Sequence, residues 1–121
     1  MANWYNGIYN AGSVELFNVV NETTSHTVNG ASVRSYQWRE AQFHLYCSSL
    51  TGTSDTLDVK IQVQDPTTEQ WTDIATFAQL IAAGSATLVV TAALGSLIRP
   101  VYTTGGTVTD CDFKLGVVWK G

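Results

Sequence analysis

Few side chains in this sequence could do chemistry, and they stand apart from one another. A nucleophile needs a base beside it, and the only histidines are His26 and His44. His26 lies in a Thr- and Ser-rich loop, and His44 lies on the polar side of an alternating segment. The sequence contains no Gly-x-Ser-x-Gly elbow, phosphate loop or His-Glu-x-x-His pattern. We therefore expect no catalytic residues and a protein that is not an enzyme.

Paired carboxylates occur twice, as Asp55 with Asp58 and as Asp110 with Asp112. Such pairs could bind calcium or act as the acid and base of a glycosidase. Asp58 and Asp112 alternate with apolar residues, which indicates solvated strand faces. Asp55 and Asp110 fit turn positions before strands, where Asp is favoured. Because no calcium-loop spacing is present, we expect neither a metal nor another cofactor.

Two aromatic residues, Trp71 and Tyr46, could bind a sugar by stacking against a pyranose ring. Such a site needs an exposed planar ring beside polar side chains, and Trp71 follows a turn in polar surroundings. The competing interpretation places Trp71 and Trp119 at the two ends of a hydrophobic core, where large aromatic residues of small β domains usually lie. We favour the core and keep sugar stacking as the alternative.

Alternating segments predict the strands that must position these side chains. In residues 56–64, Leu, Val and Ile alternate with Asp, Lys and Gln, which is the period of a half-buried strand. Gly105 and Gly106 are expected to close a hairpin, and Pro100 indicates an edge or a bulge. The main predicted strands cover residues 14–20, 40–47, 56–64, 71–77, 87–90, 97–102 and 111–119.

About eight short strands without a sustained helical period predict an all-β, antiparallel β-sandwich or jelly-roll-like fold. A chain of 121 residues supports a single domain, which we expect over residues 13–121. Residues 1–12 are expected to form an extended arm without charge. Its large apolar side chains are costly to leave in water, so they should dock on their own domain or on a neighbouring subunit. The proposed interface residues are Trp4, Tyr5, Ile8 and Tyr9.

The charge pattern excludes two classes of partner. The chain has a net charge of −4, and its six Lys and Arg residues are scattered singly. A phosphate-binding face needs clustered basic residues, so we expect no nucleic-acid binding. Residues 74–98 carry no charge, but Gly, Ser and Thr interrupt the apolar runs. Two buried strands explain this segment better than a membrane span.

The two cysteines, Cys47 and Cys111, lie in apolar strand patterns and have no metal-ligand spacing. A bridge between them is possible if their strands face one another. Because the N-terminus shows no secretion signal, we expect two reduced thiols.

A series of loose motifs runs from about residue 56 to residue 119 of the chain. In order, they are Thr56-Leu57-Asp58-Val59-Lys60-Ile61-Gln62, Asp65, Trp71-Thr72-Asp73-Ile74, Phe77-x-Gln79, Leu94-Gly95, Ile98-Arg99-Pro100-Val101-Tyr102 and Thr103-Thr104-Gly105-Gly106-Thr107. This series resembles a group of small β-sandwich proteins found among phage structural genes. Members commonly read Arg-Val-x-Tyr where this chain has Arg99-Pro100-Val101-Tyr102. The resemblance implies a structural role in the particle, with no catalytic residues.

We predict a structural virion protein of a tailed phage, assembled in the host cytoplasm. This prediction depends on the resemblance, the small number of charged residues and the uncharged arm. Our leading hypothesis is a capsid decoration (cement) protein that binds at junctions of the major capsid protein. Closed symmetry is the norm for such assemblies, so we expect a homo-oligomer, with a trimer matching local three-fold positions. A tail, neck or fibre component is one alternative. A carbohydrate-binding β-sandwich module that uses Trp71 or Tyr46 is the other.

Overall fold

The computed structural model describes residues 12–121, which form seven strands and contain no helix. All strand pairings are antiparallel, so the predicted all-β, antiparallel fold is confirmed. Over the same residues, no helix has the length and apolar character that a membrane span requires. The strands are β1 (Ser13–Val19), β2 (Thr27–Asn29), β3 (Val33–Arg34), β4 (Glu40–Gln64), β5 (Trp71–Thr76), β6 (Gly84–Val90) and β7 (Leu97–Lys120).

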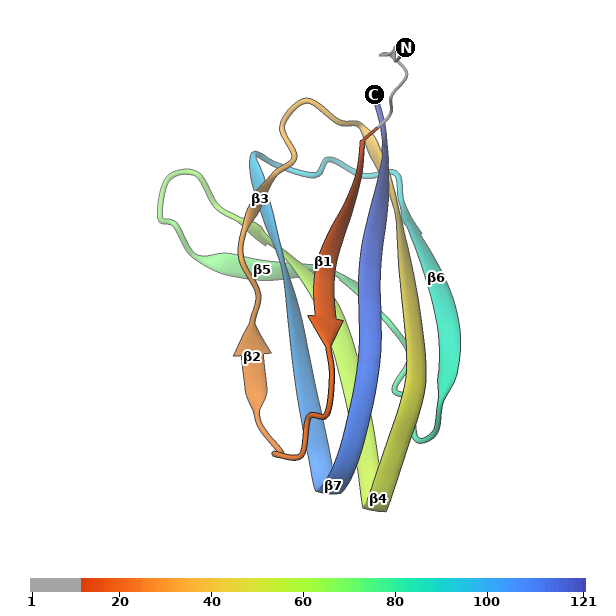
Figure 1. The fold of residues 1–121 in the computed structure, drawn as a ribbon. Coiled ribbons are helices and arrows are strands. Elements are labelled where there is room, and N and C mark those ends of the chain that lie inside the picture. The colour runs from red at the N-terminus through yellow and green to blue at the C-terminus, as the bar shows by residue number, and fades with distance from the viewer. Residues whose placement is uncertain (1–11) are drawn as a thin grey trace.

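Two of the strands are far longer than the sequence predicted. The expected strands 40–47 and 56–64 belong to β4, which has 25 residues, and 97–102 and 111–119 belong to β7, which has 24. β4 and β7 pair with each other along almost their whole length. Figure 1 shows that both strands fold back on themselves at the same end of the molecule. The fold therefore has fewer and longer strands than the eight short ones expected.

β4 and β7 together form a long two-stranded ribbon. Because the ribbon folds back, one half of it lies in each of the two layers of a sandwich. Layer one consists of β1, the C-terminal half of β7, the N-terminal half of β4 and β6. Layer two consists of the short β2 and β3, the N-terminal half of β7, the C-terminal half of β4 and β5. The two halves of β7 each pair with β4 and not with one another. The hairpin expected at Gly105 and Gly106 is therefore wrong, because this turn carries the chain from one layer to the other.

The bend has a local backbone cause. The ladder between β4 and β7 shifts register between Thr53 and Thr56, next to Ser54, which has a left-handed φ of 54°. Across the ladder, Gly106 has a φ of 74°. A Cβ atom at Gly106 would overlap the carbonyl oxygen of Ser54. Only glycine combines this φ with so close an approach, so Gly106 lets the ribbon turn here.

The core lies between the layers and follows the alternation of the strands. Phe43, Leu45 and Leu115 of layer one and Leu57 and Ile61 of layer two are at most 2% exposed. The rings of Tyr102 in layer two and Phe113 in layer one meet edge to face, with centroids 5.0 Å apart. Such aromatic pairs add stabilisation beyond the apolar area that they bury.

Pro100 lies inside a central strand, although a proline is expected at an edge. Its carbonyl oxygen accepts from the Gly30 N–H at 2.7 Å, on the side of β7 that faces β2 and β3. In an antiparallel strand, the N and C=O of one residue point to the same side. The missing N–H therefore faces the interruption between β2 and β3, and the ladder with β4 loses no donor.

Candidate binding site on the outer face of layer one

The outer face of layer one presents alternate residues of four strands in aligned rows. Pairing places outward residues opposite one another because directly paired side chains share a face of the sheet. The first row is Ser13, Val118, Gln42 and Val89; the second is Glu15, Gly116, His44 and Thr87; the third is Asn18, Lys114, Tyr46 and Ser85.

A hollow of about 380 Å³ lies at the middle row, where Gly116 contributes no side chain. A Cβ atom built on Gly116 would have a single neighbour within 4 Å, the carbonyl oxygen of Val14 at 3.6 Å. The space above Gly116 is therefore open. The side chains around it include Glu15, His44, Tyr46, Lys114 and Val118.

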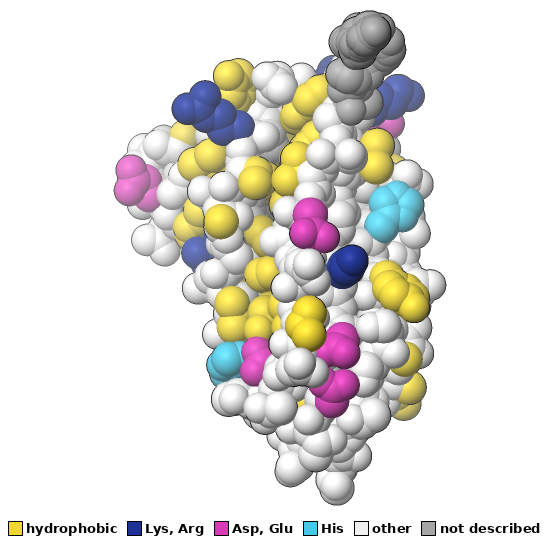
Figure 2. Space-filling model, in the orientation of Figure 1, with side chains coloured by type: hydrophobic (Ala, Val, Ile, Leu, Met, Phe, Trp, Pro, Cys, Tyr) yellow, Lys and Arg dark blue, Asp and Glu magenta, His cyan; other side chains and the backbone are white. Residues whose placement is uncertain are grey.

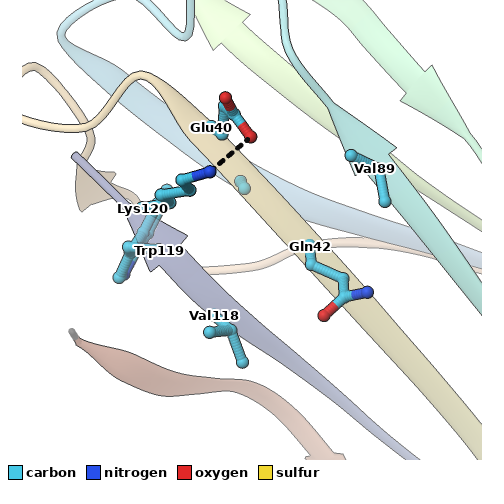
Figure 3. Close-up of a pocket in the computed structure, with 7 residues that line it drawn as sticks. Glu40, Gln42, Val89, Val118, Trp119 and Lys120 are labelled. Carbon is cyan, nitrogen blue, oxygen red and sulfur yellow. Dashed lines mark ion pairs between the residues drawn. The ribbon is translucent and has the colours of Figure 1, made fainter.

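Two further hollows continue this one along β4 and β7. One has a volume of about 270 Å³. Figure 3 shows Gln42 of β4, Val89 of β6 and Val118 of β7 among the residues that line it. The other, of about 220 Å³, is lined by Tyr46, Lys114, Ser48 and Asp112 among others. Val118 belongs to the first and the central hollow, and Tyr46 and Lys114 belong to the central and the last. We call the three together the β4–β7 groove.

The groove combines an exposed aromatic ring with fixed polar groups. Tyr46 is 59% exposed, so much of its side chain is accessible to a ligand. The His44 Nε2 lies 3.0 Å from the Gln42 Oε1, and its Nδ1 lies 3.5 Å from the Thr87 hydroxyl. These contacts hold the imidazole in one orientation beside the Gly116 hollow.

Charges in and around the groove are mixed and nearly balanced. Three acidic side chains meet two basic ones, and Glu40 and Lys120 lie 4.0 Å apart as an ion pair. Figure 2 shows that the basic side chains on the visible face do not gather into one patch. The acidic residues are Glu15, Glu40 and Asp112, and the basic residues are Lys114 and Lys120.

The two predicted sugar-stacking residues lie on opposite faces of the sandwich. Trp71 pairs with Gln64 at the start of β5, on the outer face of layer two. The Arg99 guanidinium carbon lies 4.4 Å from the centre of the Trp71 ring and covers one face of it. Trp119 lies in the core at 3% exposure, as predicted, whereas Trp71 is half-buried and does not belong to the core.

Polar residues of the sequence motifs form one network on the outer face of layer two. Gln62 accepts from the Arg99 Nε at 2.8 Å and donates to Asp73 at 2.9 Å. Lys60 lies 3.3 Å from the same Asp73 carboxylate. Together with Trp71 under Arg99, these residues connect β4, β5 and β7. Motifs that are separate in the sequence therefore form a single structural unit.

Three of the four carboxylates considered as metal ligands accept hydrogen bonds within the fold. Asp58 accepts from the Gln79 amide at 3.0 Å, Asp110 accepts from the Ser49 hydroxyl at 2.6 Å, and Asp112 accepts from a backbone N–H at 2.6 Å. Within residues 12–121, no three His, Cys, Asp or Glu residues gather in a way that could hold a metal ion.

Cys47 and Cys111 are free thiols in the core, at 1% and 0% exposure. Burial raises the pKa of the Cys111 thiol to about 12 and raises that of Cys47 as well. Because the thiolate is the reactive form, neither side chain is a nucleophile near neutral pH.

A partly buried carboxylate network lies at the other end of layer two and was not predicted from the sequence. The Tyr102 hydroxyl donates to the Glu22 Oε1 at 2.6 Å, and the His26 Nε2 lies 2.7 Å from the same oxygen. The hydrogen bond from Tyr102 is the main cause that lowers the pKa of Glu22 to about 2. These contacts attach the segment between β1 and β2 to β7.

The proposed interface residues Trp4, Tyr5, Ile8 and Tyr9 lie outside the described residues. The first described residue, Gly12, extends the ladder of layer one, because its carbonyl oxygen accepts from the Trp119 N–H at 2.9 Å.

Comparisons with known proteins show the fold. No protein-family model matches the sequence, and no curated protein matches it. The PBSX exported protein XepA superposes with a TM-score of 0.67 at 12% identity, over 91% of this chain and 37% of XepA. A CBM4 structure superposes with a TM-score of 0.54 at 14% identity, over 97% of this chain and 84% of that one. The CBM22-1–GH10 modules of xylanase 10B from Clostridium thermocellum give 0.51 at 12% identity, over 90% of this chain and 26% of that one. The chain is thus a β-sandwich of the kind that occurs in XepA and in carbohydrate-binding modules.

Proposed function

We propose that this protein is a structural component of a tailed-phage particle and acts there as a capsid decoration protein. The observation that carries the proposal is the network on the outer face of layer two. Lys60, Gln62, Trp71, Asp73 and Arg99 all belong to the motifs that resemble phage structural proteins, and they contact one another across three strands. A scarcity of charge also supports the proposal, since charged residues are depleted in the buried centre of protein interfaces.

In this proposal, the protein forms a closed homo-oligomer, with a trimer preferred, over junctions of the major capsid protein. The residues Trp4, Tyr5, Ile8 and Tyr9, three of them aromatic, supply the anchor to the capsid. Buried aromatic side chains are the residues that most often dominate binding energy at protein interfaces.

The anchor is tested by removing residues 2–11 and measuring co-sedimentation with capsid shells that have been stripped of this protein. Gly12 is kept because its hydrogen bond to Trp119 belongs to the ladder of layer one. We expect full-length protein to pellet with the shells and the truncated protein to stay in solution with an unchanged melting temperature. Equal binding by both proteins would contradict the role of the arm, and absence of binding by the full-length protein would contradict the decoration role.

A second candidate function, carbohydrate binding, is favoured by one specific observation. The exposed Tyr46 ring lies beside a hollow and polar side chains, which is the arrangement that a sugar-binding site needs. CBM4 and CBM22 are carbohydrate-binding modules by name, and their fold is shared by this chain. A decoration protein on the outside of a particle could carry such a site in addition to its structural role.

A further inference from the structure

We propose that the β4–β7 groove binds a linear, uncharged polysaccharide, with one sugar ring stacked on Tyr46 beside the hollow that Gly116 opens. This inference rests on the carbohydrate-binding candidate and assigns it a site and a class of ligand.

The shape of the groove fits a linear polymer. Its three hollows follow one another along a single pair of strands and share residues at each junction, Val118 at one and Tyr46 with Lys114 at the other. From Gln42 to Ser48, β4 advances six residues, which is about 20 Å at the rise of a strand. A chain lying along β4 and β7 would place successive units in successive hollows.

The chemistry of the groove fits sugar rings. A pyranose ring has an apolar face and a rim of hydroxyl groups that both donate and accept hydrogen bonds. Tyr46 offers the aromatic surface, the carboxylates of Glu15 and Asp112 offer acceptors, and Gln42 offers both a donor and an acceptor. Charge-assisted hydrogen bonds to the two carboxylates are stronger than neutral ones and would fix the orientation of the chain.

The charges of the groove argue for an uncharged polymer. A polyanion would need clustered basic residues, but Lys114 and Lys120 lie among three acidic side chains, and Lys120 is paired with Glu40. Because the acidic and basic charges nearly balance, the groove attracts neither polyanions nor polycations strongly. An uncharged polymer is therefore the ligand that fits it.

A protein partner fits the groove less well. Five apolar residues that line it are exposed, namely Val14, Val20, Tyr46, Val89 and Val118, at 39%, 65%, 59%, 60% and 42%. They are separated by polar residues, whereas a stable protein interface buries about 800 Å² on each partner around an apolar centre. The surface is therefore suited to a narrow ligand.

Gly116 gives a direct test, because its hollow can be filled without strain. The residue does not have a left-handed φ, and its Cβ atom would lie at an ordinary contact distance from its nearest neighbour. Valine is favoured in strands, so Gly116→Val should keep the stability while its methyl groups occupy the hollow. Tyr46→Ala removes the stacking surface. Tyr36→Ala is the matched control, because Tyr36 is 63% exposed and does not line the groove.

The experiment measures the retardation of the full-length protein and these variants in native gels that contain a soluble polysaccharide. The panel consists of hydroxyethylcellulose, mixed-linkage β-glucan, arabinoxylan and galactomannan, with heparin as the charged polymer. We expect at least one uncharged polymer to retard the wild-type protein and Tyr36→Ala equally. Gly116→Val and Tyr46→Ala should each lose at least tenfold in affinity, with melting temperatures that show an intact fold.

Different outcomes reject different statements. If no polymer retards the wild-type protein, the carbohydrate-binding candidate itself fails, and the inference fails with it. If a polymer binds and both groove variants retain the affinity, the candidate stands and the groove is not the site. Binding to heparin alone would reject the preference for an uncharged polymer. Weaker self-association of both groove variants, with no polymer bound, would assign the groove to a second copy of the chain.

Discussion

Among the individual residues, Glu22 is kept in its charged form in the folded protein by hydrogen bonds from identified partners. Its side chain is 14% exposed and accepts hydrogen bonds from the Tyr102 hydroxyl and from the Thr24 N–H. The pKa falls from an ordinary value of 4.5 to about 2, chiefly because the Tyr102 hydrogen bond stabilises the carboxylate. A lowered pKa in the folded state stabilises the protein above the unfolded pKa, and this stabilisation is lost as the pH falls toward the folded pKa.

Glu22→Gln should therefore lower the free energy of unfolding at pH 7 by about 1–2 kcal/mol, because a hydrogen bond to a charged group is replaced by a neutral one. The gap between wild type and variant should narrow as the pH falls from about 5 toward 2, because the wild-type carboxylate then loses its advantage. Urea unfolding at a series of pH values measures the gap. A gap that is independent of pH would show that Glu22 acts by packing and not by charge.

Single residues differ in how far the sequence could predict them. Alternation predicts that Tyr46 lies on the polar face of its strand, and the structure exposes it there. Gly116 also occupies an outward position of an alternating strand. Because glycine has no side chain, this position could have indicated a hollow on the outer face. Nothing in the sequence near Glu22 indicates Tyr102, because the two residues are 80 positions apart and meet only through the fold.

Among the elements, the bent β4–β7 ribbon decides the architecture. Alternation located both halves of each strand, because the buried face of a strand follows from its period. The continuity of each strand was not predictable, because the polar residues 51–55 have the composition of a loop and lack a buried face. Residues 51–53 pair across the ladder with residues 107–110, and such contacts between distant segments leave no local pattern in the sequence.

The two glycines of the bend make the cause of the turn testable. Gly106→Ala should destabilise the protein by at least about 1–2 kcal/mol, the cost of a left-handed conformation for a residue with a Cβ atom. Its Cβ atom would also overlap the carbonyl group of Ser54, which is part of the backbone and cannot rotate away as a side chain can. Gly105→Ala is the control, because its Cβ atom would meet the Thr56 hydroxyl, a side-chain atom that can rotate away. Thermal unfolding compares the two, and equal losses would contradict the assignment of the turn to Gly106.

For the whole molecule, we propose different roles for the two outer faces of the sandwich. The outer face of layer two carries the network formed by residues of the motifs that resemble phage structural proteins. The outer face of layer one carries the groove. The fold class could be predicted, because composition and strand period determine it. The separation of Trp71 and Tyr46 onto opposite faces could not be predicted, because it depends on which layer each strand joins.

The structural role in a virion is tested most directly by the copy number of this protein in particles purified from its natural source. Quantitative mass spectrometry would compare it with the major capsid protein of the same particles. The proposal predicts hundreds of copies in a simple ratio to the shell subunit, because a decoration protein occupies every equivalent junction. A handful of copies per particle would move the protein to the tail or neck, and its absence from purified particles would contradict the structural role.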